Sequence, residues 1–237
     1  MNGFFITGTD TDIGKTALSA LLLAELRRRD INAAPMKPAQ TGCEGDGVPD
    51  LDYSLSMTGM KVPNEDYRLM SPCRFEPACS PHLAAELAGV EIELAKIVRA
   101  AQELTATYDR LIIEGAGGIL VPLNRNKTML DLMKALGLPV LLAARPGLGT
   151  INHTLLSIRA LRSAGLDIAG VVLIESEEAK AGLIEEDNIT TIEQFGNVPV
   201  LGTIPFCAQL RDPAPRYENL PLPVVAEIEK ITNQLMI

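Results

Sequence analysis

Residues 3–16 read GFFITGTDTDIGKT and join a short apolar run to a loop and then to a segment rich in Ala and Leu. Strand, glycine-bounded loop and helix in this order form a phosphate-binding loop, in which backbone N–H groups and a helix N-terminus face an anion. Lys15 is placed to reach β- and γ-phosphate oxygens, and Thr16 to offer its hydroxyl to Mg²⁺. Five residues separate Gly8 from Gly14, where the standard pattern has four. We therefore predict a nucleoside-triphosphate site with a stretched loop.

Length and composition restrict the class of protein. A chain of 237 residues suits one large α/β domain, residues 1–237, better than two ordinary domains. The net charge of −9 is the wrong sign for a protein that tracks the phosphate backbone, so we expect no nucleic-acid partner. The four cysteines have no zinc or redox spacing, and no secretory leader or membrane-spanning run is visible. We expect a cytoplasmic protein with no membrane partner.

Short apolar runs alternate with amphipathic segments along the whole chain, which favours a mostly parallel central sheet flanked by helices. The expected class is a P-loop NTPase-like three-layer α/β fold. The expected strands cover residues 3–7, 33–37, 110–114, 139–144, 168–174 and 199–204. The expected helices cover residues 15–29, 80–87, 91–107, 129–136, 151–164, about 188–195 and 224–235. Residues 41–81 are the least regular region, with a short helix expected around 52–58.

Two further strand ends carry chemistry, because ligands of open α/β sheets collect outside the carboxyl ends of the strands. KPAQTG, residues 37–42, puts Lys37 where it neutralises a γ-phosphate or an anionic substrate. EGAGG, residues 114–118, places Glu114 as the acidic partner of a metal at a P-loop. Asp52 is the preferred second carboxylate for Mg²⁺, and Asp46 and Asp50 stay open by spacing.

GLGTINH, residues 147–153, follows an expected strand and opens a helix. Free N–H groups at this helix start would bind the carboxylate of a substrate. Helix capping by Thr150 explains the same motif equally well, so both interpretations stay open.

These four motifs, together with SPH at residues 80–82, resemble those of the dethiobiotin synthetase family in content and order. The family has the same five-residue gap in its loop, and related P-loop proteins of cell division and chromosome partition share only the first motif. The resemblance implies an ATP- and Mg²⁺-dependent ligase of biotin biosynthesis. It would convert 7,8-diaminopelargonate and CO₂ to dethiobiotin, ADP and phosphate, through a carbamate and a carbamic–phosphoric anhydride. It also implies a homodimer with active sites at the subunit interface.

The resemblance assigns roles to particular residues. For catalysis it implies Lys37, Lys15 and Thr11. For the nucleotide it implies Asp12, Ile13, Gly14, Lys15, Thr16, Ala17, Glu114, Gly117 and Pro205. For the metal it implies Thr16, Asp52 and Glu114. For the substrate it implies Thr41 beside the amines and, from the neighbouring subunit, Gly149, Thr150, Ile151 and Asn152 at the distal carboxylate.

Two points stay open in this interpretation. Ile174 stands where the family tends to place an Asn that reads the purine, so the sequence does not fix the base. The alternative function is a dimeric switch ATPase of the partition or cell-division type that acts on a protein or membrane partner. Against it, residues 224–237 carry only one lysine, and residues 9–13 carry none.

Overall fold

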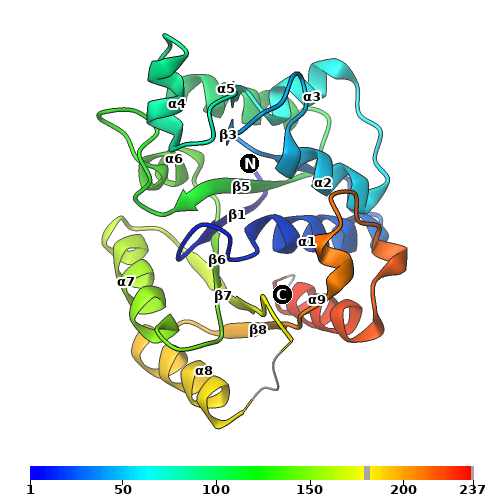
Figure 1. The fold of residues 1–237 in the computed structure, drawn as a ribbon, viewed down its shortest axis with the longest axis vertical. Helices are drawn as coiled ribbons and strands as arrows, with labels where there is room; N and C mark the ends of the chain where they lie inside the picture. Colours follow the sequence, from blue (N-terminus) through cyan, green and yellow to red (C-terminus); the bar gives the residue numbers. More distant parts are fainter. Residues whose placement is uncertain (179–181, 236–237) are drawn as a thin grey trace.

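Strand β1 (Gly3–Gly8) lies in the middle of the main sheet, between β5 (Arg110–Gly118) and β6 (Val140–Ala144). The computed structural model describes residues 1–178 and 182–235. Strand β2 (Ala33–Met36) pairs with β5, and β7 (Ile168–Ile174) and β8 (Val200–Ile204) continue the sheet beyond β6. All five pairings are parallel, so the carboxyl ends of the strands share one edge (Figure 1). The expected fold class is confirmed.

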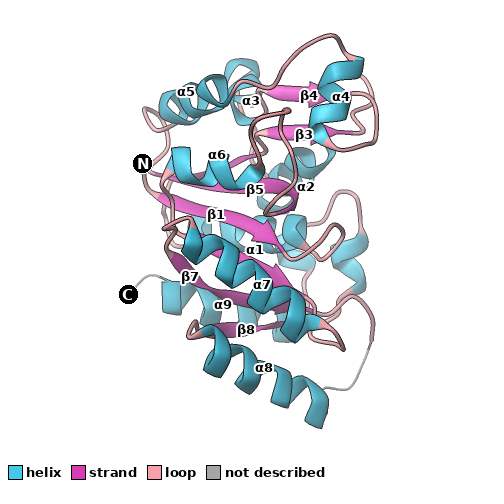
Figure 2. Cartoon of the chain, turned by 90° about the vertical axis from the view of Figure 1, so that its left-hand side faces the viewer, coloured by secondary structure: helices cyan, strands magenta, loops and turns pink. Residues whose placement is uncertain are grey.

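Helices cover both faces of this sheet (Figure 2). Alternate strand residues point to opposite faces, so Phe5 joins one hydrophobic cluster with α5 to α8, while Phe4 and Ile6 join a second cluster with α1 and α9. The helices are α1 (Lys15–Arg28), α2 (Pro49–Thr58), α3 (Asn64–Met70), α4 (Pro81–Leu87), α5 (Leu94–Leu104), α6 (Met129–Leu136), α7 (Thr150–Ser163), α8 (Leu183–Gly196) and α9 (Leu222–Leu235). None of the helices in residues 1–178 and 182–235 is long and apolar enough to cross a membrane.

All six predicted strands are present, and the differences from the prediction are local. Strand β5 continues four residues past Glu114, so this side chain lies within a strand and not at its end. Helix α8 begins at Leu183 and not near residue 188. The irregular region contains α3 and two three-residue strands, β3 (Ala39–Thr41) and β4 (Cys73–Phe75), which were not predicted. In the part of the chain that the structure describes, these two strands pair only with each other, and three residues are too few to show a periodic pattern.

The register of the sheet determines which side chains meet at its carboxyl edge. Met36 pairs with Ile113, so the next residues along the two strands, Lys37 and Glu114, come side by side. Ile6 pairs with Glu114, which places the loop after β1 next to the same two residues. Strands β1, β2 and β5 therefore deliver three of the quoted motifs to one place.

A buried carboxylate fixes the far end of α1. Glu25 is 4% exposed, accepts a hydrogen bond from the hydroxyl of Tyr217 at 2.8 Å and pairs with Arg29 at 2.7 Å. Tyr217 belongs to the segment that leads into α9, so this contact holds α1 and the C-terminal segment together.

Replacing Tyr217 by Phe removes one donor from the buried Glu25. We expect Tyr217→Phe to lower the free energy of unfolding by about 1–3 kcal/mol in urea titrations, because a buried carboxylate loses a partner. The exposed neighbour Glu218 is the control, and Glu218→Gln should stay within about 0.5 kcal/mol of the unchanged protein. Equal stabilities of the two variants would contradict this role of Tyr217.

Candidate active site

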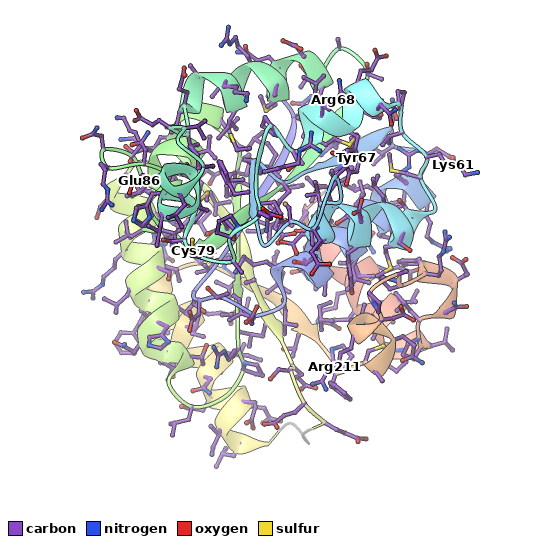
Figure 3. All side chains as sticks on the ribbon, turned by 45° about the horizontal axis from the view of Figure 1, so that its top comes forward. Lys61, Tyr67, Arg68, Cys79, Glu86 and Arg211 are labelled. Atoms are coloured by element: carbon purple, nitrogen blue, oxygen red, sulfur yellow. The ribbon has the colours of Figure 1, made fainter. Side chains whose placement is uncertain are left out.

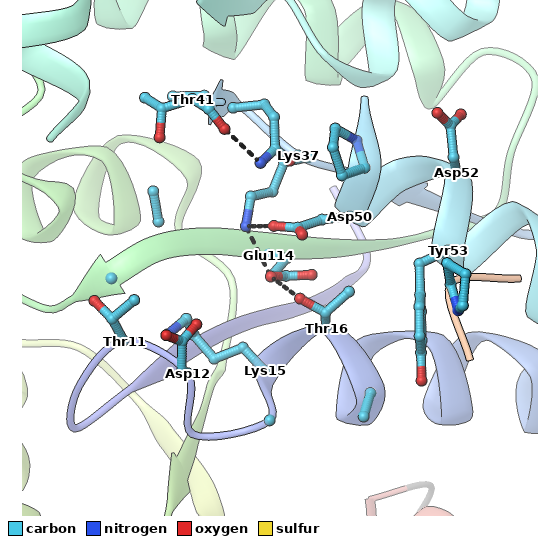
Figure 4. A pocket seen from close by; sticks show the side chains of 18 of the residues that line it. Thr11, Asp12, Lys15, Thr16, Lys37, Thr41, Asp50, Asp52, Tyr53 and Glu114 are labelled. Carbon is cyan, nitrogen blue, oxygen red and sulfur yellow. Dashed lines mark hydrogen bonds and ion pairs between the residues drawn. The ribbon is translucent and has the colours of Figure 1, made fainter. Parts of the chain in front are cut away.

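A pocket of about 680 Å³ opens at the carboxyl ends of β1, β2 and β5 (Figure 4). Its wall brings together most of the residues that the sequence predicted for the site. The predicted residues that line it are Thr11, Asp12, Gly14, Lys15, Thr16, Ala17, Lys37, Thr41, Asp52, Glu114 and Gly117.

The loop after β1 has a conformation that requires glycine at its last position, Gly14. Gly14 has φ 91°, a left-handed conformation that favours glycine, and a Cβ there would lie 2.7 Å from Cγ2 of Ile174. Among the described residues no side chain caps α1, so its first N–H groups have no side-chain acceptor there. The Nζ of Lys15 donates a hydrogen bond to the carbonyl of Asp10 at 2.7 Å. Burial lowers the pKa of Lys15, although Glu114 opposes this effect.

A buried ion cluster lies on the opposite wall. Nζ of Lys37 is 2.7 Å from Oε1 of Glu114 and 2.5 Å from Oδ2 of Asp50. The hydroxyl of Thr16 donates to the same Oε1 at 2.8 Å, which joins the P-loop to the cluster. Lys37 and Glu114 are 5% and 4% exposed. Three elements thus meet at one carboxylate oxygen: α1, β5 and the end of β2.

Electrostatics in this cluster favour a charged lysine. Burial by itself lowers the pKa of Lys37, but Glu114 and Asp50 together outweigh it and hold this pKa above the ordinary lysine value. Burial raises the pKa of Glu114, as does the charge of Asp50, and Lys37 opposes both. The ammonium group of Lys37 is therefore a fixed positive charge in the wall of the pocket.

The three loop carboxylates that the sequence left open have different surroundings. Asp50 joins Lys37 in the cluster. Asp52 also lines the pocket, but its oxygens accept hydrogen bonds from the hydroxyl of Tyr67 at 2.7 Å and from the N–H of Val48 at 3.0 Å. Asp46 is exposed and is not among the lining residues of this pocket. Asp50 and Asp52 both lie in the first turn of α2, which begins at Pro49.

Ile13 and Pro205 line an adjoining pocket of about 250 Å³, which shares the wall at Asp12, Gly14 and Ala17 with the first. Ile174 contributes an apolar surface there. Glu175, the next residue, accepts a hydrogen bond from the N–H of Phe206 at 3.2 Å. The position that the sequence left open for base recognition therefore lies beside the phosphate loop.

The start of α7 lies apart from both pockets. Gly149, Thr150, Ile151 and Asn152 line neither of them. Gly149 occupies the cap position with φ 90°, and no side chain of residues 1–178 or 182–235 caps this helix. The hydroxyl of Thr150 instead lies 3.3 Å from that of Thr154, so the capping interpretation of Thr150 is wrong. The neighbouring Leu148 is 99% exposed.

Several lining residues were not predicted. Gln40 and Ala39 lie within the quoted KPAQTG motif, and the buried amide of Gln40 donates to the carbonyl of Thr41 at 3.1 Å. The hydroxyl of Tyr53 donates to the carbonyl of Leu210 at 2.8 Å and ties α2 to the segment after β8. Leu210 and Pro213 come from that segment, and no sequence motif indicates that they reach this pocket.

Replacing Lys37 by Met leaves Glu114 buried beside Asp50 without the cation that opposes the rise of its pKa. A carboxyl group with a higher pKa in the folded chain than in the unfolded chain stabilises the fold less as the pH rises between the two values. We therefore expect Lys37→Met to lower the free energy of unfolding more at about pH 8 than at about pH 5.5. Urea titrations of this variant and of the exposed control Lys61→Met check this, and an equal loss at both pH values would contradict the cluster.

Comparisons with known proteins show the family to which the chain belongs. Residues 2–214 match a family model described as an AAA domain. The chain is 37% identical over 216 residues to the ATP-dependent dethiobiotin synthetase of Thermodesulfovibrio yellowstonii, covering 88% of this chain and 90% of that protein. It is 42% identical over 213 residues to the synthetase of Anoxybacillus flavithermus, covering 86% and 92%.

Among solved structures, the MinC:MinD cell division protein complex of Aquifex aeolicus has a TM-score of 0.67 and 17% identity, over 100% of this chain and 96% of that one. A likeness at this identity concerns the fold alone. The two synthetases, in contrast, share more than a third of their residues with this chain over most of their length. The resemblance noted from the motifs is thus confirmed, and the chain belongs to the family of ATP-dependent dethiobiotin synthetases, which are ligases.

Proposed function

We propose that the pocket beside the phosphate loop closes a cyclic urea from a diamine and CO₂ at the expense of ATP. The substrate would be 7,8-diaminopelargonate, and the products dethiobiotin, ADP and phosphate. The observation that carries the proposal is the buried cation of Lys37, which lines the same pocket as Lys15 at the start of α1 and Thr41 on β3. These side chains would supply positive charge between a triphosphate and a second anion.

The chemistry requires such charge. One amine would first take up CO₂ as a carbamate, and a carbamate oxygen would attack the γ-phosphorus to give a carbamic–phosphoric anhydride. The second amine would then displace phosphate and close the ring. A carbamate and a triphosphate repel each other, so fixed cations between them lower the cost of the in-line approach. Lys15 and Lys37 line the pocket and would supply these cations, and Thr11 would contact the carbamate or the phosphate.

The donor set also fits Mg²⁺. This ion takes one or two carboxylates plus substrate phosphates and water, and not a cage of protein ligands. Among the described residues no group of three His, Cys, Asp or Glu side chains is arranged as a complete metal site. The hydroxyl of Thr16 donates a hydrogen bond to the carboxylate of Glu114. Asp50 forms an ion pair with Lys37 beside them, and Asp52 lines the same pocket. Thr16 and Glu114 would hold Mg²⁺ with one of the two aspartates, and the ion would neutralise phosphate charge when bound.

The nucleotide and the distal carboxylate would use the remaining predicted residues. The base would lie in the adjoining pocket at Ile13 and Pro205, with its phosphates at Gly14, Ala17 and Gly117. The distal carboxylate would bind at the start of α7 from a second copy of the chain, in a cytoplasmic homodimer. Two facts support this: α7 begins without a side-chain cap, and its first residues are away from the pocket of their own chain.

The substrate requirement is tested by phosphate release from ATP. We expect release to depend on both 7,8-diaminopelargonate and bicarbonate, with dethiobiotin detected by mass spectrometry in equal amount, because the γ-phosphate needs the carbamate as acceptor. Omission of the diamine is the control. Phosphate release that is independent of the diamine, without a cyclic urea, would favour a switch ATPase instead.

Mixed dimers test the shared site. We expect Lys37→Ala and Asn152→Ala each to inactivate the protein, and their co-expression to restore about a quarter of the activity, because half of randomly mixed dimers carry one intact site. The matched control pairs Lys37→Ala with Thr41→Ala, whose positions line the same pocket of one chain, and this mixture should stay inactive. Equal activity of the two mixtures would contradict a site built from two subunits.

A further inference from the structure

A second concave site has a charge opposite to that of the chain as a whole. A pocket of about 360 Å³ lies between α3, β4 and α5, and we call it the basic groove. Four of its eight lining residues are cations and one is an anion, in a chain with 21 cations and 30 anions. Figure 3 marks Arg68 and the neighbouring Tyr67 on this part of the molecule. The basic groove is lined by Arg68, Leu69, Pro72, Arg74, Lys96, Arg99, Ala100 and Glu103.

The cations of the basic groove have no acidic partner in the described part of the chain. Within residues 1–178 and 182–235, none of Arg68, Arg74, Lys96 and Arg99 forms an ion pair. Some exposed cations elsewhere do, and Arg125 pairs with Glu86 at 2.6 Å. Like charges that line one groove repel each other. An acidic protein has many carboxylates that could pair with these cations, and none of the described ones does so here. A polyanion would relieve this repulsion.

The shape and the residue types define the chemical class of the ligand. Three of the cations are arginines, whose planar guanidinium groups each bind two oxygens of a phosphate at once. Arg74 stacks on the ring of Tyr67 at 5.7 Å, which fixes its orientation. Leu69, Pro72 and Ala100 give the groove an apolar floor, and its volume suits a small molecule. We propose that the basic groove binds a small polyanion with two or more phosphate groups.

The paired strands β3 and β4 connect the basic groove with the active-site pocket. Arg74 lies on β4, and its partner across the β3–β4 pair is Gln40, which lines the pocket. Tyr67, under Arg74, donates its hydroxyl to Asp52 in the pocket wall. A ligand on Arg74 would thus contact the same short sheet that carries Thr41. The inference does not depend on which reaction the pocket catalyses.

Binding of inorganic pyrophosphate and tripolyphosphate tests the proposal by calorimetry. The measurements use full-length protein with Lys15→Ala, which weakens the competing site at the phosphate loop. In about 150 mM salt, we expect one ligand to bind per chain. Adding Arg68→Ala and Arg99→Ala should raise the dissociation constant at least about tenfold, because charge-assisted hydrogen bonds are lost. The matched control adds Arg125→Ala and Lys127→Ala, two exposed cations outside the groove, and should bind as before. Circular dichroism checks that each variant folds.

Two results would overturn the proposal. One is binding of the same strength in the groove variant and in the control variant, because the anion would then bind elsewhere. The other is binding that appears only at ligand concentrations of about 10 mM or more, which non-specific attraction explains. Citrate serves as a comparison anion, and citrate binding tighter than that of tripolyphosphate would overturn the assignment to phosphate groups. Since no turnover is measured, failure here is distinct from failure of the ligase proposal.

Discussion

The ammonium group of Lys37, buried between the carboxylates of Glu114 and Asp50, is the constraint on which the site depends. A buried charge is costly unless it is paired, so the chain must bring β2, β5 and α2 together at one point before this lysine is stable. Thr16 bonds to the same carboxylate and ties the phosphate loop into the cluster. The geometry of the pocket is therefore a consequence of folding as a whole and not of any single motif.

Much of the architecture follows from local sequence patterns. Buried parallel strands read as short apolar runs, which is why all six strands of the main sheet were predicted. The strand–loop–helix order that predicted a phosphate loop is present as β1, the loop after it and α1, despite the extra residue in the loop. The motif order also indicated that Lys37, Thr41 and Glu114 belong to one site, and they line one pocket. These features depend on neighbours in sequence or on parallel strands that end at a common edge.

The rest depends on contacts between distant segments. Asp50 and Asp52 are two residues apart in the first turn of α2, so spacing does not tell which one faces Lys37; packing of the helix decides it. Strands β3 and β4 exist only because they pair with each other. The backbone carbonyl of Leu210 accepts a hydrogen bond from the hydroxyl of Tyr53, which holds Leu210 at the pocket. A backbone acceptor has no sequence signature. The role that we propose for the start of α7 would need a second copy of the chain, which one sequence does not describe.

The same fold serves cell division proteins, so the fold alone does not determine the reaction. Our proposal for the reaction therefore rests on the side chains of the pocket, and on Lys37 above all. The most direct measurement compares ATP binding and dethiobiotin formation in Lys37→Ala. Our account predicts that this variant still binds ATP but forms no dethiobiotin, because the cation serves the reacting groups between the two substrates. Loss of ATP binding together with activity would contradict it, since Lys37 would then only anchor the nucleotide.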